Sequence, residues 1–83
     1  MTTVEVQFDT DIFSALRRSP EEVAHDLRLG AAIHWYALGL VSQGKGAEIA
    51  GLSRSEFIDA LSRSGVSPVQ ESLEEIREAL ARG

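Results

Sequence analysis

The chain has no cysteine among its 83 residues, and this absence excludes several classes of protein. Disulfide scaffolds, thiolate metal sites and cysteine nucleophiles all require a thiol. Positive charge is scarce as well, because 8 Lys and Arg residues stand against 13 Asp and Glu, for a formal net charge of −5. This acidic balance disfavours a protein that coats nucleic acid or an anionic membrane with its whole surface.

Long hydrophobic runs and targeting signals are also missing. The most apolar run, residues 29–41, is interrupted by His34 and by glycines, whereas a membrane-spanning helix needs about 20 apolar residues. Residues 1–10 contain no basic side chain and no apolar segment typical of a signal peptide. We therefore expect a cytoplasmic protein that does not engage a membrane.

The composition is otherwise that of a folded domain, with 43% hydrophobic and 25% charged residues. A chain of this size buries only about 60% of its unfolded surface, so we expect a homodimer or another protein partner. Capping and turn residues divide it into three segments of one compact unit. These are a strand-helix-helix dimerisation segment (1–41), a helix-turn-helix-like segment (42–65), and an extended stretch with a C-terminal partner-binding helix (66–83).

The N-terminal segment begins with alternating apolar and polar residues, which predicts a short half-buried strand over residues 4–8. A lone strand leaves its backbone groups unpaired, so we expect it to pair with the same strand of a second chain through Val4, Val6 and Phe8. A short and a long helix follow, which gives a mainly α fold with a ribbon-helix-helix start. The outward Gln7 would then enter the DNA major groove. The alternative is a dimerising strand whose polar face meets only water.

The long helix has a clear start at Ser19-Pro20-Glu21-Glu22, a capping box with proline at the first helical position, and we expect it to run to about Leu38. From Leu29 onward it is apolar nearly all round, which is typical of a helix central to the core. The stripe that we expect to face the core comprises Val23, Leu27, Ala31, His34 and Leu38, and it is widened by Ala24, Ala32 and Tyr36.

The central segment resembles a helix-turn-helix, because Ser42 and Ser53 can each cap a helix and Gly51 can form the turn between the two helices. The candidate DNA contacts in this segment are Gln43, Lys45, Arg54, Ser55 and Arg63. Its local charge is balanced, whereas DNA readers usually show a basic excess. A plain helical hairpin without a nucleic-acid role therefore stays open.

Other motifs are weaker. Gly39 and Gly44-Lys45 have the spacing of a P-loop, but Gly46 stands where a serine or threonine is needed and no strand precedes the glycines. The histidines have no metal-ligand spacing, and no nucleophile, base and acid can be assembled. We therefore expect a binding protein, not an enzyme, without metal or cofactor.

From Tyr36 to Gly65 the chain carries a specific combination, including Gly44-Lys45, Ala47-Glu48 and Ala50-Gly51-Leu52-Ser53. It resembles a family of small uncharacterised prokaryotic proteins regarded as antitoxins and usually encoded beside a PIN-domain-like ribonuclease. The resemblance covers the chain from the predicted strand through Val69. It implies a type II toxin–antitoxin protein that neutralises a PIN-like nuclease and acts as transcription repressor by binding operator DNA.

The C-terminal segment offers a way to bind such a nuclease. An apolar stripe of Leu73, Ile76 and Leu80 could dock in a groove of the partner, while Arg77 or Arg82 meets its acidic, metal-binding site. The alternative is that this stripe packs inside its own chain. Two other functions stay open, namely a stand-alone transcription regulator and a protein-interaction adaptor without DNA binding.

Overall fold

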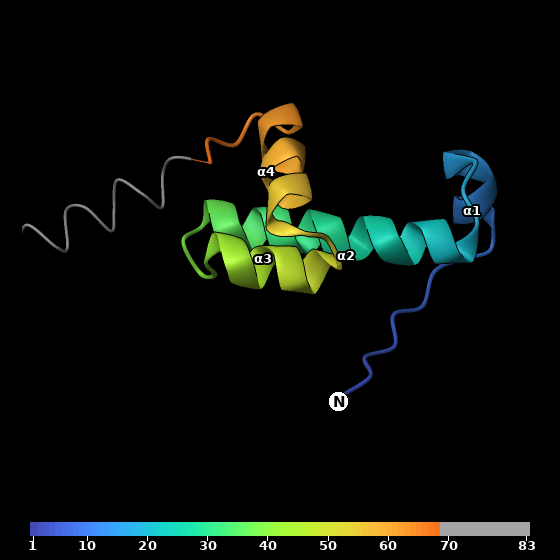
Figure 1. The fold of residues 1–83 in the computed structure, drawn as a ribbon. Coiled ribbons are helices and arrows are strands. Elements are labelled where there is room, and N and C mark those ends of the chain that lie inside the picture. Colours follow the sequence, from blue (N-terminus) through green and yellow to red (C-terminus); the bar gives the residue numbers. More distant parts are fainter. Residues whose placement is uncertain (69–83) are drawn as a thin grey trace, which may run out of the picture.

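A computed structural model of the chain describes residues 1–68. Four helices follow one another in this part, α1 (Asp11–Leu16), α2 (Pro20–Ala37), α3 (Gln43–Ala50) and α4 (Arg54–Arg63) (Figure 1). The mainly α class matches the sequence prediction, and so do the starts of α2, α3 and α4 after their serine caps and the end of α3 before Gly51. The predicted C-terminal helix lies outside the described residues.

Serine caps start the three longer helices, as predicted. Ser19 and Ser53 each form a complete capping box with the glutamate three residues later, and Ser42 accepts a hydrogen bond from the Lys45 N–H at 3.1 Å. The backbone N–H of Ser19 donates to the Glu22 carboxylate, and this bond lowers the pKa of Glu22. The caps satisfy amide groups that a helix start otherwise leaves unpaired.

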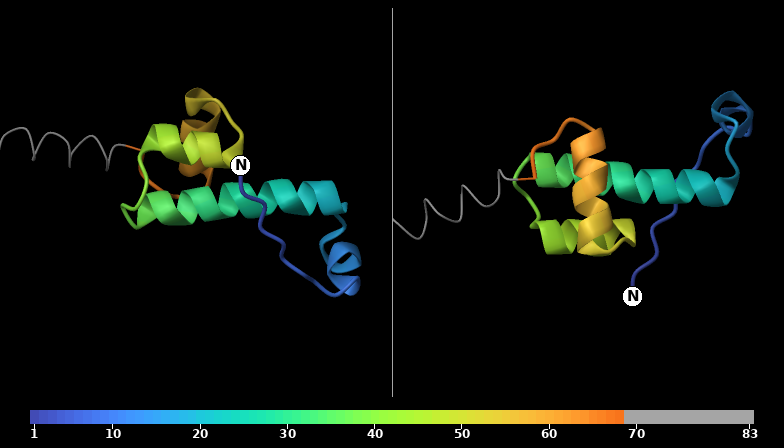
Figure 2. Two further views of the ribbon diagram at one scale, coloured as in Figure 1. Left: turned by 90° about the horizontal axis from the view of Figure 1, so that it is seen from below. Right: turned by 45° about the horizontal axis from the view of Figure 1, so that its top comes forward.

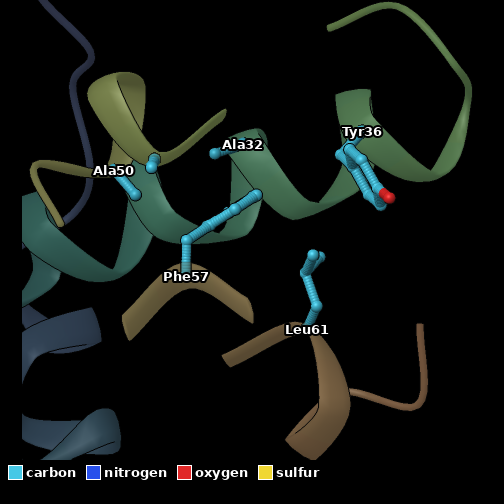
Figure 3. Packing of buried hydrophobic residues seen from close by; sticks show 6 residues of the cluster. Ala32, Tyr36, Ala50, Phe57 and Leu61 are labelled. Atoms are coloured by element: carbon cyan, nitrogen blue, oxygen red, sulfur yellow. The ribbon is translucent and has the colours of Figure 1, made fainter. Parts of the chain in front are cut away.

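The other three helices lie at the two ends of α2. α3 lies beside the C-terminal half of α2, and α4 crosses both of them, whereas α1 lies at the opposite end of α2 (Figures 1 and 2). The main hydrophobic cluster therefore lies at the end of α2 where α3 and α4 pack, while Val23, near the start of α2, is buried apart from it. The hydrophobic cluster there comprises Ala32, Tyr36, Ala47, Ala50, Phe57 and Leu61 (Figure 3).

Small residues allow the helices to approach closely in this core. Phe57 is fully buried and meets the Tyr36 ring edge-on, with ring centroids 6.1 Å apart and an interplanar angle of 86°. A Cβ added to the buried Gly46 would lie 2.7 Å from the Phe57 ring, which is too close without a shift. The glycine at this position therefore lets α3 lie directly against the side chain that α4 inserts.

The prediction of an N-terminal β-ribbon is wrong. Residues 1–68 contain no strand, and residues 1–9 run as an irregular segment ahead of α1. Val4 and Val6 are 80% and 63% exposed, and even Phe8 is 39% exposed. Alternating apolar and polar residues only make a segment compatible with a strand. The segment forms a strand when a neighbouring strand pairs with its N–H and C=O groups. No described segment provides that pairing, so the predicted ribbon-helix-helix start is wrong as well.

The face that α2 turns to the core differs in part from the prediction. Val23, Ala32 and Tyr36 are buried as expected, whereas Ala24, Leu27, Ala31, His34 and Leu38 are exposed or half-buried. The core face also includes Leu29 and Ile33, which lay outside the predicted stripe. Because the second half of α2 is apolar nearly all round, its periodicity fits either face, and the docking of α3 and α4 decides between them.

Candidate functional site

The feature closest to a known functional architecture is the pair formed by α3 and α4, which we call the α3–α4 pair. Gly51 ends α3 with a positive φ of 71°, and the Leu52 N–H donates to the Ala47 carbonyl at 2.9 Å. Ser53 then caps α4 immediately. This short connection lays α4 across the α2–α3 layer, with one side of α4 in the core and the other in solvent (Figure 2). A helix presented in this way is the element that helix-turn-helix proteins insert into a major groove.

The solvent side of α4 carries a mixture of polar and charged groups. Ser55 and Arg63 are both exposed, as the DNA-binding prediction requires of them. Glu56 occupies the first turn, where its carboxylate accepts from the Ser53 N–H at 2.9 Å, and this bond lowers its pKa. The start of α4 thus holds its own negative charge, which offsets the attraction of the helix N-terminus for a phosphate.

Arg54 and Gln43 serve an internal purpose in the structure. The Gln43 side chain is buried, with 6% of the residue exposed, and its Oε1 accepts from Arg54 Nε at 3.2 Å and from Arg54 Nη2 at 3.0 Å. Gln43 Nε2 donates to the Pro68 carbonyl, which also accepts from the Tyr36 hydroxyl at 3.2 Å. Buried polar groups need such partners. These bonds tie the starts of α3 and α4 to the end of α2 and to the chain beyond α4.

The other candidate cations on the α3–α4 pair lie in exposed ion pairs. Lys45 Nζ is 3.0 Å from the Glu48 carboxylate, and Arg63 Nη2 is 3.2 Å from the Asp59 carboxylate. Exposed pairs of this kind contribute roughly 0–1 kcal/mol, so either cation can exchange its carboxylate for a phosphate at little cost. The nearby carboxylates nevertheless keep the local charge balanced.

The structure does not bring the remaining candidates to this surface. Gln7 lines a shallow hollow with Phe8, Ile12 and Ala15, at the end of α2 that lies away from α4. The predicted dimer contacts Val4 and Val6 lie in the same irregular N-terminal segment. The predicted partner contacts Leu73, Ile76, Arg77, Leu80 and Arg82 lie outside the described residues.

The described residues offer neither a cluster of metal ligands nor a helix that could span a membrane. Residues 1–68 hold no group of three His, Cys, Asp or Glu side chains that could bind a metal ion. Among the helices of this part of the chain, none is long and apolar enough to cross a membrane.

Sequence reasoning missed an apolar surface on α2. Leu27, Trp35 and Leu38 are 45%, 40% and 60% exposed, on the side of the helix that faces away from the core. Leu40, in the turn after α2, is 67% exposed. The signal was present, since a helix that is apolar nearly all round has more apolar surface than one core face can cover.

The chain was compared with known proteins, and no solved structure matches it. Residues 1–82 match the uncharacterised protein family UPF0175. A UPF0175 protein of Aeropyrum pernix is 37% identical over 70 residues, which cover 84% of this chain and 78% of that protein. A UPF0175 protein of Archaeoglobus fulgidus is 39% identical over 74 residues, which cover 89% of this chain and 82% of that protein.

Proposed function

Since the chain belongs to the UPF0175 family of uncharacterised proteins, we propose that it is an antitoxin-like protein with two binding activities. The α3–α4 pair binds operator DNA, and a separate surface binds and neutralises a PIN-like nuclease. The observation that carries the DNA-binding part is the presentation of α4 across the α2–α3 layer after a three-residue connection, Gly51-Leu52-Ser53. The nuclease part is supported by the resemblance in sequence.

The geometry divides the candidate DNA contacts into two groups. Lys45, Ser55 and Arg63 are exposed and available to DNA. Arg54 is tied to the buried Gln43, so its main contribution is to hold α4 at a fixed angle against α3. We therefore expect Arg63 and Lys45 to contact phosphates or base edges, and Arg54 to position the helix that carries them.

The balanced charge of the α3–α4 pair favours a second candidate, an adaptor that binds only protein. Lys45 and Arg63 each lie beside a carboxylate, and Glu56 adds a negative charge at the start of α4. A DNA complex must separate these ion pairs, whereas a protein surface of mixed charge can match them.

DNA binding is tested by fluorescence anisotropy of the full chain with the DNA upstream of its own gene, over a series of salt concentrations. Arg63→Ala is expected to weaken binding several-fold and to reduce the salt dependence by about one phosphate contact. Arg18→Ala is the matched control, because Arg18 is an exposed arginine paired with carboxylates, at the other end of α2. No binding of this DNA would favour the adaptor. Equal affinities of both variants and the wild type would show that Arg63 is not a DNA contact and would contradict the assignment of DNA binding to α4.

Nuclease binding is tested by a native pull-down of the tagged full chain from its own cells, followed by mass spectrometry. A PIN-like nuclease recovered in a fixed ratio to the chain supports the antitoxin function, and its ribonuclease activity should fall when purified chain is added. A complex that contains DNA and no nuclease would favour a stand-alone regulator.

A further inference from the structure

α2 has a second apolar face, on the side opposite the core. We call it the outer stripe, and it comprises Ala24, Leu27, Ala31, His34, Trp35 and Leu38. All of these residues are exposed or half-buried. The core face of the same helix is formed by Leu29, Ala32, Ile33 and Tyr36. α2 is therefore apolar on both sides, and α3 and α4 cover only one of them.

The outer stripe has the spacing of a helix–helix seam. Successive members at 24, 27, 31, 34 and 38 are alternately three and four residues apart, so they lie along one side of the helix. The stripe contains no carboxylate and no lysine or arginine, although the chain as a whole carries a net charge of −5. Depletion of charged residues is typical of the buried centre of a protein interface.

We propose that the outer stripe is the interface between two copies of this chain, paired antiparallel about a two-fold axis at Ala31. Such an interface must be self-complementary, because each residue meets its symmetry-related position. Leu27 and Trp35 are each four residues from Ala31, so Leu27 of one copy faces Trp35 of the other. Ala24 and Leu38 are each seven residues from Ala31, so a small residue faces a large one. His34 is three residues from Ala31 and faces the exposed Arg28, which places this pair at the polar edge of the interface.

The centre of the stripe suits a close approach of the two helices. Ala31 is half-buried, and a Cβ built on its neighbour Gly30 has no atom within 4 Å. Small residues at a crossing point let two helix backbones come near, while the larger side chains pack on either side of it. Antiparallel pairing also sets the two helix dipoles in opposite directions, which is favourable.

The exposed apolar area is sufficient for a weak dimer. With about 150–250 Å² for a large side chain, the exposed fractions of Leu27, Trp35 and Leu38 add up to roughly 200–350 Å² per copy. The largest apolar patch on a typical monomer covers about 300–600 Å². Two copies remove roughly 400–700 Å² from this source, and the alanines and His34 add to it, which gives an interface in the range below ~1,200 Å² where weak complexes lie.

The first test is analytical ultracentrifugation of the full chain without DNA or partner. We expect a concentration-dependent shift from the 9.0 kDa monomer to twice that mass. Leu27→Glu and Leu38→Glu should each weaken dimerisation at least tenfold, with helix content by circular dichroism unchanged because both side chains are exposed. Val6→Glu, which adds the same charge at an exposed N-terminal position, is the control and should leave dimerisation unchanged.

A second test fixes the direction of pairing by cross-linking, for which the chain is convenient because it has no cysteine. Ala31→Cys should cross-link to itself with a short bis-maleimide. Leu38→Cys alone should not, because its two copies lie about 21 Å apart along an antiparallel axis. A mixture of Leu38→Cys with Ala24→Cys should cross-link.

Several results would overturn the proposal. These are a monomer at every soluble concentration, a dimer that Val6→Glu disrupts while Leu27→Glu does not, and efficient self-cross-linking of Leu38→Cys. The inference is independent of the proposed function. A chain that stays monomeric could still bind DNA or a nuclease, and a dimer through the outer stripe could form in an adaptor.

Discussion

Replacing Gln43 by alanine is expected to destabilise the protein more than replacing any exposed polar side chain of residues 1–68 by alanine. The Gln43 side chain is buried and bonds Arg54 through Oε1 and the Pro68 carbonyl through Nε2. Loss of the bond to a charged group costs about 1.5–3 kcal/mol when the donor stays dry. Arg54 is exposed enough to regain water, so we take about 1 kcal/mol for this part.

The remaining loss of stability comes from the amide nitrogen of Gln43, Nε2. Without Gln43 Nε2, the Pro68 carbonyl keeps only the Tyr36 hydroxyl among the partners described above, and a lost bond of this kind contributes about 1 kcal/mol. The cavity left by the shortened side chain adds to this. We therefore expect Gln43→Ala to lower the free energy of unfolding by about 2–3 kcal/mol, out of a total of roughly 4–12 kcal/mol for a chain of this length.

The assay is urea unfolding of the full chain followed by far-UV circular dichroism, with thermal unfolding as a second measure. A loss of this size should lower Tm by roughly 10–20 °C. Arg54→Ala should cost about 1 kcal/mol, and the double variant should cost less than the sum of the two, because both substitutions remove the same bonds. Arg63→Ala, which removes an exposed ion pair, is the control and should change stability by no more than about 0.5 kcal/mol.

The reasoning is refuted if Gln43→Ala unfolds within about 0.5 kcal/mol of the wild type, since the buried amide would then contribute nothing. Strict additivity with Arg54→Ala would refute the narrower claim that these two side chains stabilise each other. In that case Arg54 would be free to act as a DNA contact in its own right.

Other substitutions test the core, the capping boxes and the helix backbone. Phe57→Ala removes a fully buried ring and should cost about 3–5 kcal/mol in urea unfolding, and a loss below about 1 kcal/mol would contradict the described core. The pKa values of Glu22 and Glu56 are lowered in the folded state by their bonds to the Ser19 and Ser53 N–H groups. Both carboxylates therefore stabilise the fold fully at pH values above the ordinary glutamate pKa of about 4.3. This stabilisation is lost as the pH falls through the lowered pKa values. The double variant E22Q/E56Q keeps the capping bonds but cannot titrate there, so its urea midpoint should fall less than that of the wild type between neutral pH and about pH 3. Gly30 lies inside α2, and a Cβ at this position has no atom within 4 Å. Gly30→Ala should therefore raise the free energy of unfolding of a dilute, monomeric sample by up to about 1 kcal/mol, measured by thermal unfolding.

Local chemistry explains why the helices of the described part were predictable. Ser19, Ser42 and Ser53 each cap the helix that they were expected to cap, because a serine oxygen within reach of a free N–H is a short-range arrangement that needs no tertiary contact. Gly51 ends α3 for an equally local reason, since its positive φ is strained for residues with a side chain.

The candidate site was only partly accessible to the same reasoning. Exposure of Ser55 and Arg63 follows from their places on an amphipathic helix. Burial of Gln43 does not, because it depends on Arg54 and on Pro68, which are 11 and 25 residues further along the chain. A polar residue at a helix start is usually exposed, and only the contact of that start with other elements buries it.

The sequence by itself therefore determined where α2, α3 and α4 begin and end, because serine caps and glycines act over a few residues. The tertiary structure alone decided which side of α2 became the core. Tyr36 and Leu38 both belong to the stripe that the sequence predicts to face the core. The structure buries Tyr36 under α3 and α4 and leaves Leu38 60% exposed. It also decided against a strand at Val4–Phe8, since a strand exists only where another segment pairs with its backbone. Both outcomes depend on contacts between distant segments, and hydrophobic periodicity carries no information about which segment will supply them.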